Sequence, residues 1–89
     1  MAEPKASQPN TPWVLLMTEG CHLCDEAEHW LAEHGVNRDR YRLTEIIDHP
    51  DWLAQWGEKI PVLLHERTGQ AFTWPFVADT AGVVRALSE

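Results

Sequence analysis

The sequence has little cysteine, no excess of positive charge and no long apolar run, and each shortage excludes a class of protein. A net charge of -7, with the histidines neutral, opposes binding to the phosphate backbone of nucleic acids. No apolar run approaches the ~20 residues that a membrane-spanning helix needs, and no Gly-rich phosphate-binding loop is present. We therefore expect neither a nucleic acid nor a membrane among its partners.

The first twelve residues, 1–12, contain three prolines and almost no bulky apolar side chain. Such a segment cannot bury enough surface to offset the entropy of ordering it, so we expect a disordered tail. Because the segment also lacks the apolar stretch of a signal peptide, the expected location is the cytoplasm. Residues 13–89 are expected to form a single small domain, stabilised in part by five large tryptophan side chains.

The hydrophobic pattern of this domain predicts alternating strands and helices. An apolar run at 13–17 is typical of a buried strand, and over 21–33 the period changes to that of an amphipathic helix ending before Gly35. The pattern further predicts a strand at 41–47 and a short helix at 50–56. It also predicts a hairpin of two strands, 62–65 and 71–74, and a last helix from 75 onward. The order β-α-β-α-β-β-α predicts an α/β domain, a four-stranded mixed sheet flanked by helices, with a right-handed first crossover.

Two predicted helices have apolar faces that we expect to be buried. The members of the first face are Leu23, Ala27, Trp30, Leu31 and His34. The members of the last are Val77, Ala81, Val84 and Leu87.

The two cysteines, Cys21 and Cys24, lie at the predicted junction of the first strand and first helix. A disulfide between them would close a very short loop and add little stability, so the pair is more typical of redox chemistry than of a structural link. Unpaired N–H groups and partial positive charge at a helix N-terminus stabilise a thiolate. We expect Cys21 to be the accessible nucleophile and Cys24, on the same side as Ala27 and Leu31, to be the resolving thiol.

Charged neighbours of the cysteine pair have opposite effects on the stability of a thiolate there. A protonated His22 favours a neighbouring thiolate, whereas Glu19, Asp25 and Glu26 oppose it. A structural zinc usually needs four ligands, and the chain has one CxxC pair without a facing pair of histidines. No metal ligand is therefore predicted.

A second feature is Lys59-Ile60-Pro61, which directly precedes the predicted strand at 62–65. Proline is tolerated at the start of a strand, so this segment alone indicates nothing. Together with the strand, Cys-His-Leu-Cys and helix upstream, and with Trp74-Pro75-Phe76 downstream, it resembles the thioredoxin fold, and in particular its glutaredoxin-like branch of small bacterial proteins. The resemblance covers roughly residues 13–87.

This resemblance implies a thioredoxin-like fold and thiol–disulfide oxidoreductase activity on protein or small-molecule disulfides. It also implies a cis bond at Pro61, beside the cysteines, and pairing of the Ile60 backbone with a bound substrate strand. Lys59 is a candidate contact for a substrate carboxylate, and His22 and Trp74 complete the predicted substrate-binding residues.

The residues that would hold glutathione depart from the glutaredoxin pattern. Glutaredoxins usually have a basic residue shortly before the first cysteine, where this sequence has Glu19. They also carry a glycine pair followed by an acid at the last helix, whereas this sequence has the bulky Trp74 in that segment. We expect no bound cofactor, and glutathione is one candidate for a reductant whose identity the sequence leaves open.

Two other functions are open at this stage. The cysteines could be ligands of a metal or iron–sulfur binding module, as in glutaredoxin-like proteins that hold a cluster between two chains. Alternatively, the chain could be a non-catalytic interaction domain with a thioredoxin fold.

Overall fold

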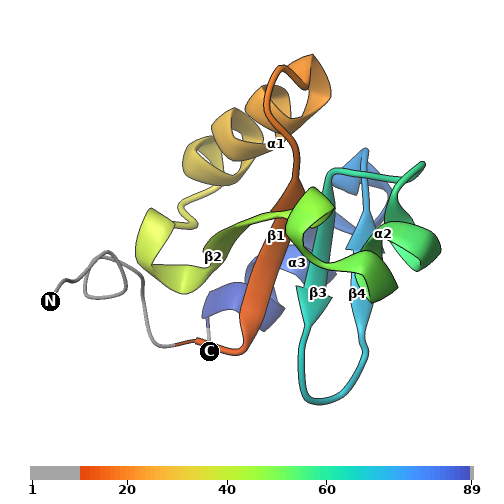
Figure 1. Cartoon of the computed structure of the whole chain (residues 1–89). Helices are drawn as coiled ribbons and strands as arrows, with labels where there is room; N and C mark the ends of the chain where they lie inside the picture. The colour runs from red at the N-terminus through yellow and green to blue at the C-terminus, as the bar shows by residue number, and fades with distance from the viewer. Residues whose placement is uncertain (1–10, 89) are drawn as a thin grey trace, which may run out of the picture.

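The computed structural model of the chain describes residues 11–88, and its elements follow the predicted order (Figure 1). The strands in this range are β1 (Trp13–Met17), β2 (Arg42–Glu45), β3 (Val62–His65) and β4 (Ala71–Thr73). The α-helices are α1 (His22–Glu33), α2 (Pro50–Trp56) and α3 (Thr80–Ser88). Short 3-10 helices lie at Arg38–Arg40, Ile46–Asp48 and Phe76–Asp79. Among the helices in residues 11–88, none has the length and apolar character that crossing a membrane requires.

The strands form a single mixed sheet in the order β2-β1-β3-β4. Strand β1 pairs with β2 in parallel, whereas the β1–β3 and β3–β4 pairs are antiparallel. The parallel pair is the one that α1 connects, as expected for a β-α-β unit. Strand β1 therefore lies inside the sheet, which explains why its sequence is apolar at every position.

Alternate residues of β1 enter two separate hydrophobic cores, because successive side chains of a strand point to opposite faces. Trp13 and Leu15 pack with residues of α1 and α3, including Leu31 and Leu87. Val14 and Leu16 pack on the other face, together with Ile46 and the two tryptophans of α2. In Figure 1, α2 lies in front of the sheet and α3 behind it. The predicted α/β fold of thioredoxin-like type, with helices on both faces of a four-stranded mixed sheet, is confirmed.

The buried face of α1 differs from the predicted one. Its buried residues are Cys24, Ala27 and Leu31, whereas Leu23 is 48% exposed and His34 is exposed. The spacings of three and four residues from Cys24 to Leu31 define a narrow stripe, and Leu23 lies one residue outside it. The predicted end of the helix is confirmed, since Gly35 follows it with a φ of 82°, the left-handed conformation that favours glycine.

Two other predicted elements are shorter than expected. Ile46 and Ile47 were predicted in the second strand but belong to a 3-10 helix, which leaves Ile46 buried and Ile47 62% exposed. The predicted last helix begins with a separate 3-10 helix at Phe76–Asp79. A 3-10 helix has three residues per turn, so it breaks the 3.6-residue phase that the prediction extended through it.

This change of phase exposes part of the predicted last face. Val77 is 63% exposed and Ala81 is also exposed, while the buried residues of the segment are Phe76, Val83 and Leu87. Of the predicted face, only Leu87 is fully buried.

Most of the predicted N-terminal tail, residues 1–10, lies outside the described residues. The two residues before the predicted start of the domain, Thr11 and Pro12, make backbone hydrogen bonds to it. The Thr11 carbonyl accepts a hydrogen bond from the Arg42 side chain at 3.0 Å, and the Pro12 carbonyl accepts one from the Glu66 N–H at 2.9 Å. These backbone contacts do not depend on apolar side chains, so composition alone does not indicate them.

Candidate active site

Cys21 lies where the loop after β1 turns into α1. Gly20, with a φ of 81°, provides the turn, and the Cys21 N–H donates to the Thr18 carbonyl at 3.3 Å. Cys21 is the N-cap of α1: its backbone is extended, and its Sγ accepts a hydrogen bond from the Cys24 N–H at 3.1 Å. A sulfur atom at this place receives both a helix N–H and the positive end of the helix dipole.

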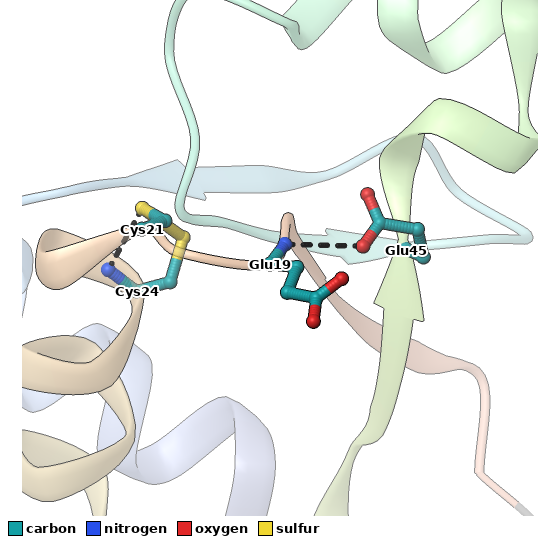
Figure 2. The surroundings of a disulfide bond; sticks show 4 residues. All are labelled: Glu19, Cys21, Cys24 and Glu45. Carbon is teal, nitrogen blue, oxygen red and sulfur yellow. Dashed lines mark hydrogen bonds between the residues drawn. A yellow bond between two sulfur atoms is a disulfide. The ribbon is translucent and has the colours of Figure 1, made fainter.

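The two cysteines are joined in a disulfide, with their Cα atoms 5.2 Å apart (Figure 2). Cys24, in the first turn of α1, is 1% exposed, whereas Cys21 is only half-buried. The two cysteines therefore differ in exposure, and Cys21 is the more accessible residue.

The first residues of β3 and the last residues of β4 lie at the same end of the sheet as the last residues of β1. Leu16 pairs with Val62, and Val62 pairs with Thr73. Continuing this register by one residue places Pro61 between the end of β1 and Trp74. The Trp74 N–H donates to the Pro61 carbonyl at 3.2 Å. The Ile60–Pro61 bond is cis, as the resemblance implies, and the Trp74–Pro75 bond is also cis, which the sequence analysis does not predict.

The other two predicted substrate-binding residues, His22 and Lys59, are exposed. His22 is the first residue of α1 and is exposed. Lys59 is exposed in the turn after α2, where its N–H donates to the Trp56 carbonyl at 2.8 Å. Within residues 11–88, neither side chain makes a hydrogen bond or ion pair, whereas Pro61 and Trp74 are joined by a backbone hydrogen bond.

Glu45 is a neighbour of the cysteine loop that the sequence analysis missed. It lies at the end of β2, paired in register with Met17, and its Oε1 accepts a hydrogen bond from the Glu19 N–H at 3.1 Å (Figure 2). Its Oε2 accepts one from the Ile47 N–H at 3.3 Å. The available signal was an acid at the end of a strand parallel to β1, because the carboxyl ends of parallel strands meet at one edge.

The surroundings of Glu45 favour its ionised form. A hydrogen bond from the Thr18 side chain is the main cause that lowers the pKa of Glu45. Burial opposes this effect, and hydrogen bonds from the Ile47 and Glu19 backbone lower the pKa further. The carboxylate therefore acts as a hydrogen-bond acceptor at neutral pH.

The site combines a strand, a Cys-x-x-Cys sequence at the start of a helix and a second strand that follows a proline. Comparison with known proteins identifies the family to which this arrangement belongs. Residues 13–85 match the model of the glutaredoxin-like domain (DUF836). The chain belongs to this glutaredoxin-like family.

A solved structure supports the same assignment for this glutaredoxin-like domain. The X-ray structure of Northeast Structural Genomics target protein XcR50 from X. campestris is similar to it with a TM-score of 0.65 and 28% sequence identity. The similarity covers 85% of this chain and 95% of that chain. Comparison with curated proteins finds no match.

In this glutaredoxin-like domain, the start of α3 differs from the glycine pair and acid expected for a glutathione site. Asp79 is present, but its Oδ1 accepts a hydrogen bond from the Gly82 N–H at 3.2 Å. The carboxylate thus caps the helix, satisfying one of the N–H groups that a helix start leaves unpaired. Residues 11–88 contain no group of three or more His, Cys, Asp or Glu side chains that could hold a metal ion.

Proposed function

We propose that the protein is a thiol–disulfide oxidoreductase in which Cys21 is the nucleophile and Cys24 the resolving thiol. The observation that carries the proposal is the contrast between the two cysteines: Cys21 is half-buried and its Sγ accepts a helix N–H, whereas Cys24 is 1% exposed. A hydrogen bond to the thiolate and the helix dipole both lower a thiol pKa. Membership of the glutaredoxin-like family supports this chemistry.

In the first step, the Cys21 thiolate attacks one sulfur of a substrate disulfide. A bond forms between Cys21 Sγ and that sulfur, the substrate S–S bond breaks, and the second substrate sulfur leaves as a thiolate that takes up a proton. In the second step, the Cys24 thiolate attacks Cys21 Sγ, and the first substrate sulfur leaves. The substrate gains two electrons, and the protein is left with the Cys21–Cys24 disulfide.

A second pair of thiols must then return the protein to its dithiol form. Such a reductant, a dithiol or two monothiols, attacks the half-buried Cys21 and reverses the two steps, itself becoming a disulfide. We propose that this cycle takes place in the cytoplasm, where a reducing environment keeps cysteines available as thiols. Glutathione is a candidate among monothiols, although Asp79 already caps α3.

The proposed substrates are disulfides of proteins or small molecules that reach the edge of the sheet beside Cys21. We propose that the Ile60 backbone pairs with an extended substrate segment, and that Pro61 and Trp74 line the contact. The position of Pro61 between the end of β1 and Trp74 supports this arrangement. His22 and Lys59 are proposed only as peripheral contacts, since both are exposed.

The proposal is tested by the reduction of insulin, with dithiothreitol as the reductant, by the wild-type protein, Cys21→Ser and Cys24→Ser. We expect the wild type to accelerate reduction and Cys21→Ser to be inactive. Cys24→Ser should accumulate a mixed disulfide on Cys21, visible as an added mass. Equal acceleration by Cys21→Ser, or none by the wild type, would refute the proposal.

A further inference from the structure

The Glu45 carboxylate connects two segments that are far apart in the sequence. Its Oε1 binds the Glu19 N–H in the loop after β1, and its Oε2 binds the Ile47 N–H in the turn after β2. The Glu19 N–H belongs to the peptide unit that joins Thr18 to Glu19, so the carboxylate holds this peptide of the loop. The loop that leads to the active-site disulfide is thus held to the end of β2 through one side chain (Figure 2).

The contacts continue from Glu45 to the nucleophile. The carbonyl of the same Thr18–Glu19 peptide accepts the Cys21 N–H at 3.3 Å. One peptide unit therefore binds Glu45 through its N–H and Cys21 through its carbonyl. Cys21 in turn accepts the Cys24 N–H on its Sγ. A shift of the loop would move Cys21 away from its place at the start of α1.

We infer that Glu45 is a positioning residue for Cys21, which keeps the sulfur at the N-terminus of α1 by anchoring the Thr18–Glu19 peptide. This inference rests on the proposed function, since it assigns to Glu45 a part in setting the reactivity of the same thiol. Glu45 does not touch the cysteines; it acts through the loop.

The two effects of a nearby carboxylate on the Cys21 thiol have opposite signs, which makes the inference testable. As a negative charge, Glu45 disfavours a thiolate, so its removal should lower the pKa of Cys21. As an anchor, Glu45 keeps the sulfur near a helix N–H, so its removal should raise that pKa. The inference predicts that the anchoring effect is the larger.

The experiment measures the pKa of Cys21 in a Cys24→Ser background, by thiolate absorbance and by the rate of alkylation with iodoacetamide against pH. We expect Glu45→Ala to raise the pKa of Cys21 by about 0.5 and to slow alkylation at neutral pH about threefold. Glu45→Gln removes the charge but keeps an acceptor for the Glu19 N–H, and should restore a pKa at or below that of the parent.

Two matched variants separate anchoring from charge. Glu19→Gln removes a charge from the same loop while leaving its backbone N–H, so the pKa of Cys21 should stay the same or fall slightly. Glu45→Asp keeps the charge but draws the carboxylate back by one methylene group from the Glu19 N–H, and should raise the pKa as Glu45→Ala does. Far-UV circular dichroism of each reduced variant checks that the fold is intact.

The inference is overturned if Glu45→Ala lowers the pKa of Cys21 as Glu19→Gln does, or if Glu45→Asp leaves it unchanged. The Glu45→Asp result decides the matter even if Glu45→Ala does not fold. Alkylation does not require turnover, so failure of the wild type to reduce insulin would refute the proposed function and leave this measurement interpretable.

Discussion

At the scale of single residues, Cys21 and Cys24 are bonded to each other yet lie in different environments. Cys21 caps the helix and remains half-buried, whereas Cys24 lies on the buried stripe with Ala27 and Leu31. A substrate disulfide is larger than a water molecule, so only the more accessible sulfur offers it a path of attack. The difference in burial, rather than the CxxC pattern itself, therefore assigns the two roles that we propose.

The same helix offers two leucines for a matched test of this packing. Leu31 is fully buried, whereas Leu23 is 48% exposed. We predict that Leu31→Ala lowers the free energy of unfolding by about 2–5 kcal/mol, because it leaves a cavity in the core. Leu23→Ala should change it by less than about 0.5 kcal/mol, as for other surface substitutions. Urea unfolding of both variants measures the difference, and equal losses would show that α1 packs otherwise.

At the scale of elements, the end of α1 depends on one backbone conformation. Gly35 has a φ of 82°, and a Cβ added to it would meet no atom within 4 Å. We predict that Gly35→Ala destabilises the protein by roughly 1–2 kcal/mol, because only the left-handed backbone opposes the new side chain. Gly35→Asn should lose less, since asparagine tolerates this conformation better. Thermal unfolding of both variants measures the cost, and an alanine variant as stable as the wild type would contradict this account.

Elements with a strong local signal could be predicted from the sequence, and those that depend on neighbours could not. The run at 13–17 and the proline-led helix at 50–56 were predicted with the bounds observed for β1 and α2. By contrast, β2 ends at Glu45 because that carboxylate accepts the Ile47 N–H and the chain turns. The apolar periodicity from residue 75 onward also gave a wrong prediction of the buried face. The 3-10 helix at Phe76–Asp79 has a different number of residues per turn from the α-helix that follows it.

The candidate site shows the same division. The place of Cys21 and Cys24 between strand and helix follows from local patterns, and the cis Ile60–Pro61 bond was implied by family resemblance. The role that we infer for Glu45 depends on a contact across 26 positions of the chain. No local pattern indicates such a contact, because it exists only when β2 lies beside β1.

At the scale of the whole molecule, the sheet brings the parts of the candidate site to one edge. The end of β1 leads to the cysteines, the end of β2 supplies Glu45, and β3 and β4 supply Pro61 and Trp74. The helices cover both faces of the sheet, so two cores stabilise this edge from either side.

The central claim is that the Cys21–Cys24 pair is a working redox couple, and its reduction potential tests this claim most directly. The protein is equilibrated with mixtures of reduced and oxidised glutathione, and with mixtures of reduced and oxidised dithiothreitol for lower potentials. The disulfide fraction is counted by alkylation and mass spectrometry. We predict a potential within the ~-120 to -270 mV range of dithiol oxidoreductases. A potential well below about -300 mV, typical of structural disulfides, would contradict the account.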